Sequence, residues 1–259
     1  MKKSILSWFR SATDEAPADG PFEMQGEAGE IRGRGSYRNG QLDGAYESYF
    51  EDGQAEHKGC FREGQLDGPQ EWFHRNGQLR ERQAYHNGRK EGPWELLYPN
   101  GQWRSKGQYV DGVRNGPFRT GFPNGAPRSE GTHRNDRRDG PYVAYHENGQ
   151  VDARGSFHDG RKDGVWEWFH SNGQLAQKGV FRNDGADGVL ETFHPNGSLK
   201  SRETYVDGAK NGPFETLAAD GRLMARGTFR DGVLDGAYEL YDDDGRIREK
   251  GTYQDGVLQ

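Results

Sequence analysis

The sequence of 259 residues lacks several features that compact enzymes and exported proteins usually carry. It has a single cysteine, Cys60, which excludes an intramolecular disulfide framework. Only 31% of its residues are hydrophobic and the mean hydropathy is −1.15, which is low for a compact globule of this length. No apolar run reaches the roughly 7–15 residues of a secretory signal or the roughly 20 of a membrane-spanning helix.

The sequence also lacks the short motifs of nucleotide binding and catalysis. There is no phosphate-binding P-loop, no G-x-S-x-G nucleophile elbow, no H-E-x-x-H zinc motif and no C-x-x-C pair. With no nucleophile beside a base, the sequence predicts a protein that is not an enzyme and that needs no cofactor. The net charge is −6 and no stripe of lysine and arginine dominates, which disfavours nucleic acid as a partner.

What the chain does have is a 24-residue repeat without insertion or deletion. Two glycine columns mark it, the first from Gly44 to Gly236 and the second from Gly53 to Gly245. Such a period is typical of one supersecondary unit stacked on copies of itself. The predicted organisation is a non-repeat segment 1–18, interpreted as a cap or short anchor, and a repeat array over 19–259. The array consists of a half repeat 19–34, nine repeats over 35–250 and a half repeat 251–259.

Each repeat carries two turn signals that divide it into two short strands. The sharper signal is Asn-Gly or Asp-Gly, as at Asn76-Gly77, and it predicts a tight type I′ hairpin turn. The other turn, as at 63–68, is expected to be wider, with strands near 69–75 and 79–86. The 40 glycines cost about 1 kcal/mol each inside a helix and so disfavour helical repeats. The predicted fold class is all-β: an elongated antiparallel β-sheet solenoid of stacked β-hairpins.

Aromatic residues occupy three columns of the repeat and supply its buried surface. The first column includes Tyr37 and Phe61, the second Tyr46, and the third Tyr49. The second and third columns are three residues apart, so they would face opposite sides of a flat strand. A bulge, packing on both faces, or a curled sheet would each explain this spacing, and the sequence leaves the three open.

Two polar columns are better explained by structure than by chemistry. Four histidines share one position: His74, His146, His170 and His194. Adjacent repeats lie about 10 Å apart, so these rings cannot share one zinc ion whose ligands all lie about 2.0–2.3 Å from it. A glutamate recurs in most repeats, so no carboxylate pair is distinguished. The expected role of this column is pairing with basic residues on neighbouring strands, such as Lys58, Arg82, Lys106, Arg154, Lys178 and Arg202.

The repeat is least regular between residues 107 and 202. Gly121 and His133 replace aromatic residues, and Asp136 and Asp184 replace glycines. Drift or a local kink would explain these departures, and a partner-specific patch is the functional alternative. The candidate partner-binding residues of such a patch are Trp166, Trp168, His146, His170 and Phe122.

The core of the unit is aromatic-x-[DN]-G-x-x-[DN]-G-x-aromatic-E-x-aromatic-x-x-[ND]-G, seen as FHDGRKDGVWEWFHSNG at 157–173. It resembles the MORN-variant repeat of bacteria, and the resemblance covers residues 19–259. Arrays of this kind are similar to YwqK-type proteins, regarded as the antitoxin or immunity partners of toxins. That family has no motif of catalytic residues, so none carry over to this chain. The absence of a lipoprotein or secretion signal, seen on some relatives, favours the cytoplasm.

Together, the sequence and this resemblance predict a non-catalytic protein-binding repeat protein. The more specific prediction is an antitoxin or immunity protein that neutralises a bacterial toxin by direct contact. The toxin is expected to be encoded nearby. The alternative is a MORN-type scaffold in a protein assembly or at a membrane surface. Membrane contact is not favoured, and no metal or nucleic acid is expected to take part.

Overall fold

The computed structural model describes residues 18–259, and this part of the chain contains 27 β-strands and no helix. The strands pair antiparallel with their neighbours along the chain. This confirms the predicted all-β class. The chain divides into two compact units, residues 1–101 and 102–259, and each is described by itself.

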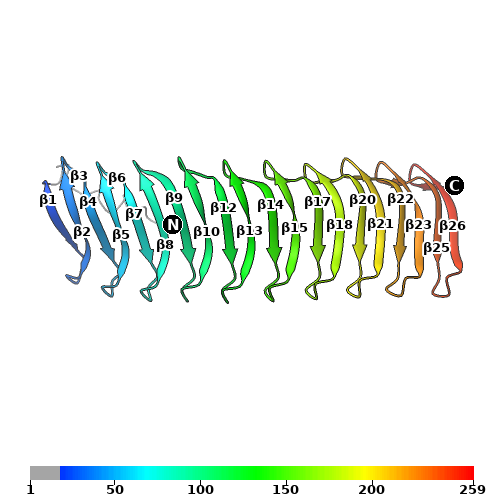
Figure 1. Cartoon of the computed structure of the whole chain (residues 1–259), viewed down its shortest axis with the longest axis horizontal. Coiled ribbons are helices and arrows are strands. Elements are labelled where there is room, and N and C mark those ends of the chain that lie inside the picture. The colour runs from blue at the N-terminus through cyan, green and yellow to red at the C-terminus, as the bar shows by residue number, and fades with distance from the viewer. Residues whose placement is uncertain (1–17) are drawn as a thin grey trace. The chain divides into compact units, whose positions relative to one another are not determined.

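Figure 1 labels most of the strands of both units. In the first unit they are β1 (Gly20–Gln25), β2 (Ile31–Arg38), β3 (Gln41–Leu42), β4 (Gly44–Tyr49), β5 (Ala55–Arg62), β6 (Gln65–Leu66), β7 (Gly68–Phe73), β8 (Leu79–His86) and β9 (Arg89–Leu97). In the second they are β10 (Trp103–Val110), β11 (Val113–Arg114), β12 (Gly116–Gly121), β13 (Pro127–Arg134), β14 (Arg137–Tyr145), β15 (Val151–His158), β16 (Arg161–Lys162), β17 (Gly164–Phe169), β18 (Leu175–Arg182), β19 (Gly185–Ala186), β20 (Gly188–Phe193), β21 (Leu199–Val206), β22 (Ala209–Leu217), β23 (Leu223–Arg230), β24 (Val233–Leu234), β25 (Gly236–Tyr241), β26 (Ile247–Gln254) and β27 (Val257–Leu258).

Within each unit, consecutive long strands pair with one another. In the first unit, Glu47 of β4 lies opposite Lys58 of β5, and Lys58 lies opposite Glu71 of β7. In the second unit, β17, β18 and β20 pair in the same way. Each repeat therefore adds two long strands to its sheet, which confirms the prediction of stacked hairpins of about 24 residues.

The tight turns lie where the sequence predicted the wider ones. At Glu63-Gly64, which joins β5 to β6, both residues have positive φ, 48° and 73°. Two adjacent residues with positive φ are the mark of a type I′ turn, whose twist matches that of the strands it joins. The second of these positions is usually glycine, but Asp136 and Asp184 occupy it with φ of 66° and 73°.

The Asn-Gly turns are three-residue loops, so their prediction as type I′ turns was wrong. At Asn76-Gly77 only the glycine has positive φ, 79°. The amide of Gly77 donates to the carbonyl of His74, and the amide of His74 donates to that of Gln78. A type I turn followed by a left-handed glycine has this pattern. The extra loop residue is Arg75, and it removes the need for positive φ at the asparagine.

A kink bends the chain after each type I′ turn. In the first unit, Tyr37 lies opposite Leu42 of β3, whereas Arg34 lies opposite Glu47 of β4, so the pairing shifts by two residues between them. Gly44 lies in this kink with φ of 100°, a conformation open to glycine without strain. Extra residues in one strand bend it. Leu42, on the short strand β3 between the turn and the kink, is buried.

The second and third aromatic columns lie on opposite faces of the sheet. Tyr46 packs edge-on against Phe61 with ring centroids 5.5 Å apart, on what we call the aromatic face. The hydroxyl of Tyr49 donates to Glu47, two residues earlier on the other face, which we call the ladder face. The register also shifts by one residue between Ser48 and Tyr49. The spacing of the columns therefore involves both a bulge and packing on two faces.

Glycine makes room for the large rings of the aromatic face. Trp166 of β17 is only 2% exposed and clusters with Phe157 and Phe181. A Cβ atom added to Gly155, on the preceding long strand, would lie 2.3–2.6 Å from three atoms of the Trp166 indole. The buried core is thus a series of small ring clusters on one face of the sheet, each resting on glycine backbone.

Two expectations lie beyond what the structure describes. The cap or anchor predicted for residues 1–18 falls almost wholly outside residues 18–259, and the predicted domain boundaries stay a prediction. Across residues 18–259 the chain forms no helix with the length and hydropathy needed to cross a membrane.

Candidate functional site

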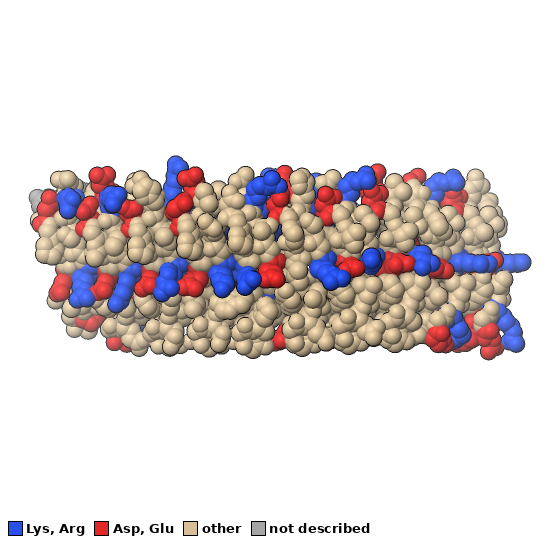
Figure 2. All heavy atoms as spheres, viewed as in Figure 1, with Lys and Arg blue, Asp and Glu red and all other residues tan. Residues whose placement is uncertain are grey.

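An alternating row of charged side chains, the charge ladder, runs across the ladder face of each unit. Residues directly opposite one another on paired strands share a face, so the register of the strands defines the row. In the first unit the ladder is Glu23, Arg34, Glu47, Lys58, Glu71, Arg82 and Glu95. In the second it is Lys106, Arg119, Glu130, Val143, Arg154, Glu167, Lys178, Glu191, Arg202, Glu215, Arg226, Glu239 and Lys250. Figure 2 shows basic and acidic side chains gathered in a band on this face.

Ion pairs link neighbours along the ladder. Arg82 contacts both of its neighbours, with Nε 3.0 Å from Glu71 and an Nη atom 2.8 Å from Glu95. At Glu167, the hydrogen bond from Arg154 lowers the pKa of the carboxyl group. These contacts confirm the expected pairing of the glutamate column with basic residues. Because the arginine side chains are about half exposed, each pair contributes little to the free energy of unfolding.

The alternation fails at one place in the second unit. Lys106 of β10 lies opposite Arg119 of β12, so two cations are neighbours. Arg119 contacts Glu130 at 3.2 Å, with the two charges in inverted order relative to the other repeats. Val143 comes next, and strict alternation resumes at Arg154. The ammonium of Lys106 lies 5.2 Å from the centre of the Trp103 ring.

Exposed valines form a second row on the ladder face of this unit. Val165 lies opposite Val180, and the two are 53% and 44% exposed. Val189, 46% exposed, precedes Glu191 by two residues as Val165 precedes Glu167, so it belongs to the same row. Further along, the row borders an open groove lined in part by Val189, Thr204, Pro213, Arg202 and Glu215. An apolar row beside a charged one is typical of a protein-binding surface.

The two tryptophans expected to contact a partner lie on the aromatic face. Trp166 is buried in the sheet, because it is 2% exposed and its Nε1 donates to the carbonyl of Ser156 at 2.9 Å. Trp168 is half-buried and stacks on Trp166 with ring centroids 5.6 Å apart. Both rings therefore pack within the sheet, and Trp168 alone keeps surface that a partner could touch.

The other candidate contact residues each immediately precede a three-residue loop. Phe122 is half-buried, with the Arg128 guanidinium 5.7 Å from its ring centre. Nε2 of His146 lies 2.9 Å from the carbonyl oxygen of Phe169, and His170 makes the matching contact to Phe193 at 3.0 Å. Each histidine thus bonds to the backbone of the following repeat, 23 residues on. The structure does not bring these loop residues together with the tryptophans.

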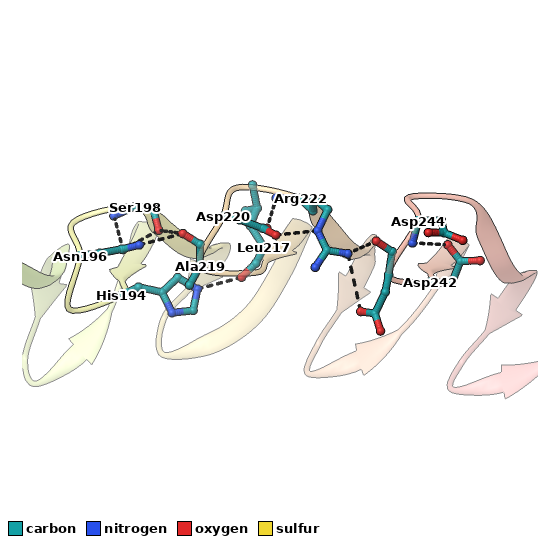
Figure 3. Close-up of polar contacts among 10 residues, drawn as sticks. His194, Asn196, Ser198, Leu217, Ala219, Asp220, Arg222, Asp242 and Asp244 are labelled. Atoms are coloured by element: carbon teal, nitrogen blue, oxygen red, sulfur yellow. Dashed lines mark hydrogen bonds and ion pairs between the residues drawn. The ribbon is translucent and has the colours of Figure 1, made fainter.

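Figure 3 shows how successive loops are tied together in the second unit. His194 reaches the carbonyl of Leu217 at 3.0 Å, and Asn196 donates to that of Ala219 at 2.8 Å. Where Asp220 replaces the asparagine, its carboxylate pairs with Arg222 at 2.7 Å. The Asn-Gly loops therefore join neighbouring repeats, in addition to closing hairpins.

The comparisons with known proteins agree with this architecture. The family model for the MORN repeat variant matches residues 66–87, 90–111, 138–159, 162–183, 186–207 and 234–255, which together make up just over half of the chain. The chain belongs to the MORN repeat variant family. A search of curated proteins found no match.

Solved structures resemble this MORN repeat variant chain only remotely. The "Crystal Structure of TcdB2-TccC3" is 11% identical with a TM-score of 0.22, over 100% of this chain and 19% of that chain. The "Crystal Structure of TcdB2-TccC3-TEV" is 12% identical with a TM-score of 0.17, over 86% of this chain and 14% of that chain. The chain thus spans about a fifth or less of the length of these proteins.

The MORN repeats of the first unit bury a polar cluster that the sequence did not predict. Nε2 of His57 lies 2.9 Å from Oε1 of Gln70, whose Nε2 donates to the carbonyl of Cys60 at 2.7 Å. His57 also stacks on Trp72 with ring centroids 4.7 Å apart. Burial lowers the pKa of His57 to about 4. The sequence signal was Gln70, which replaces an aromatic residue of the second column.

Within residues 18–259, no three or more histidine, cysteine, aspartate or glutamate side chains come close enough together to hold a metal ion. The glutamates of the second unit's ladder are engaged with arginine or lysine, as at Glu191, Arg202 and Glu215, where the distances are 3.0 and 2.7 Å. The ladder face of the second unit, with its exposed valines and its interrupted charges, is the candidate interaction surface.

Proposed function

We propose that this MORN repeat variant protein is a non-catalytic antitoxin or immunity protein that neutralises a bacterial toxin by direct contact. The observation that carries the proposal is the row of exposed valines on the ladder face of the second unit. Val165, Val180 and Val189 keep about half of their surface exposed although they are β-branched apolar residues. A contiguous exposed apolar patch with a polar rim often marks a protein-binding site.

The extent of this surface supports a protein partner over a small ligand. The row continues from Val189 to Thr204 and Pro213 along a groove bordered by ladder residues such as Arg202 and Glu215. A stable protein complex buries about 1,200–2,000 Å² with an apolar centre and a polar rim. Valines flanked by charged side chains have that arrangement. The net charge of −6 supports a protein partner over nucleic acid.

The contact residues expected from the sequence remain part of the proposal in a modified form. Trp168, His146, His170 and Phe122 are half-buried and could add contacts on the aromatic face and at the loops. Trp166 would support these contacts from within the sheet, because its ring is buried. The proposal also keeps the cytoplasm as the site of action, where a toxin would be met.

The test is co-expression with the product of the neighbouring gene, followed by purification. We expect growth to be restored and the two proteins to elute together in a fixed ratio. Val180→Asp places a charge at the centre of the valine row and should weaken the complex at least tenfold. Val257→Asp is the matched control, because Val257 is 63% exposed near the C-terminus and away from the row.

Two results would contradict the proposal. Growth restored without a complex would mean that the protein acts indirectly. Equal weakening by both substitutions would mean that the valine row does not form the contact. If this protein assembles only with other cellular proteins and leaves the toxin active, it is a MORN-type scaffold instead.

A further inference from the structure

The break in the charge ladder creates a local excess of positive charge in the second unit. Lys106 and Arg119 are directly opposite one another on β10 and β12. Like charges in this position destabilise a sheet, whereas the regular repeats place opposite charges there. Arg119 has one carboxylate partner, Glu130, at 3.2 Å, and within residues 102–259 no carboxylate lies within ion-pair distance of Lys106.

The surrounding sequence strengthens this excess. Residues 102–143 include eight basic and four acidic residues, although the whole chain has a net charge of −6. Two of the four acids are paired elsewhere, Asp136 with Arg114 at 2.9 Å and Asp139 with Arg134 at 2.5 Å. Asp136 and Asp139 are therefore engaged away from the ladder.

Further exposed arginines flank the break. Arg104 and Arg128 are exposed and lie two residues from Lys106 and Glu130 on the same strands. Beyond the break, Val143 offers no charge at all before alternation resumes. The result is a short cationic stretch at β10–β13, on the ladder face that also carries the exposed valines.

We propose that Lys106 and Arg119 form a docking site for the carboxylates of an acidic segment of the partner protein. This inference rests on the proposed function and adds the chemistry of the partner to it. Carboxylates of a partner would complete the alternation that the chain itself leaves incomplete, and they would relieve the repulsion between the two cations. The valine row further along the same face would supply the apolar part of the contact.

An acidic protein segment fits this surface better than a nucleic acid does. The cationic stretch is short, Glu130 lies within it, and carboxylates recur along the ladder from Glu167 onward. A phosphate backbone that followed the sheet would meet these carboxylates. A peptide with a few glutamates would not, because it needs to match only two or three cations.

The decisive variant is the exchange Arg119→Glu with Glu130→Lys. It keeps the net charge and restores the alternation from position 106 to position 130, since Lys106 would then face Glu and that Glu would face Lys. Removing a like-charge pair should leave the fold at least as stable as before, which thermal unfolding checks. The control exchange Arg248→Glu with Glu249→Lys is also charge-neutral and lies at exposed positions on β26.

The probe is a short synthetic peptide of alternating glutamate and threonine, titrated calorimetrically into the full-length protein. We expect binding to the wild type and to the control, and at least tenfold weaker binding to the Arg119→Glu, Glu130→Lys variant. Raising the salt from ~0.05 to ~0.3 M should weaken binding to the wild type. Equal binding to the wild type and the variant would overturn the inference. So would tighter binding of an oligothymidylate of similar charge, which would identify a nucleic-acid site.

The outcome separates this inference from the proposed function. If the peptide distinguishes the variant but no toxin is neutralised, the docking site stands and the antitoxin role fails. If the toxin is neutralised equally by the wild type and the variant, the antitoxin role stands and the docking site is refuted.

Discussion

The packing of rings over glycine predicts a large effect for a small substitution, Gly155→Ala. A Cβ at Gly155 would lie 2.3, 2.5 and 2.6 Å from three atoms of the Trp166 indole, well inside van der Waals contact. Trp166 is 2% exposed and packed between Phe157 and Phe181, so the ring has little room to move. Overpacking of this kind costs roughly 1–3 kcal/mol of unfolding free energy, and we expect a value near the upper end.

The sign of the effect is diagnostic. Gly155 does not have positive φ, so alanine fits its backbone. Without a clash, Gly→Ala would stabilise the protein by about 0.4–1 kcal/mol through the unfolded chain. We therefore expect Gly155→Ala to lower Tm by about 5–10 °C, measured by circular dichroism. If there were free space above the glycine, Tm would rise instead.

Two further variants test the cause. At Gly131 the added Cβ would lie 3.1 Å from the nearest atom of Phe118, so Gly131→Ala should cost much less than Gly155→Ala. Trp166→Leu should reduce the cost of Gly155→Ala, with a coupling of about 1 kcal/mol or more in a double-mutant cycle. An unchanged or raised Tm for Gly155→Ala, or additive effects in the cycle, would refute the packing of the second column over glycine.

Three further predictions follow from the first unit and the loops. Burial lowers the pKa of His57 to about 4 while the unfolded chain binds the proton near 6.5. The unfolding free energy should therefore fall by about 3 kcal/mol as the pH drops from about 6.5 to 4, and His57→Ala should remove this pH dependence in urea melts. Gly77 has a φ of 79°, so Gly77→Val should lower the unfolding free energy by about 1–3 kcal/mol. Arg75→Val in the same loop should lower it far less. Equal shifts in melting temperature for the two variants would refute the loop geometry. Asn172→Ala should lower the unfolding free energy by about 1–2 kcal/mol, because it removes the hydrogen bonds to Pro195 and Gln174. Asn172→Asp keeps the acceptor, so its stability should lie between those of the wild type and Asn172→Ala. An unchanged stability for Asn172→Ala would show that the loops do not join the repeats.

Much of the fold could be predicted from the repeat itself. The period of the glycine columns located the strands closely, since the strand expected at 79–86 is β8, Leu79–His86. The glutamate column predicted its own partners, because opposite charges in register on neighbouring strands stabilise one another. Arg82 between Glu71 and Glu95 confirms this.

The turn types could not be predicted from dipeptide preference alone. Asn-Gly suits a type I′ turn, but at residues 74–78 the asparagine also accepts the amide of Gln78 and donates to the carbonyl of Pro99 in the next repeat. The loop length is thus set by contacts between repeats. A single repeat contains no information about those contacts.

The burial of Trp166 and the break in the ladder have different explanations. A tryptophan that follows the aromatic pattern belongs to the aromatic face, so the column itself indicated that Trp166 is buried. The break in the charge ladder could have been predicted from the sequence. Arg119 stands in the glutamate column and Glu130 in the basic column, which becomes visible once the strand register is known.

The central claim is that this MORN repeat variant protein neutralises a toxin by stoichiometric contact through the ladder face of its second unit. The most direct measurement is a titration of toxin activity with the purified full-length protein. We expect activity to fall linearly and reach zero at a fixed whole-number ratio of the two proteins, with Val180→Asp shifting the curve to higher protein concentration. Neutralisation at far below one copy per toxin, or a curve that Val180→Asp leaves unchanged, would contradict the claim.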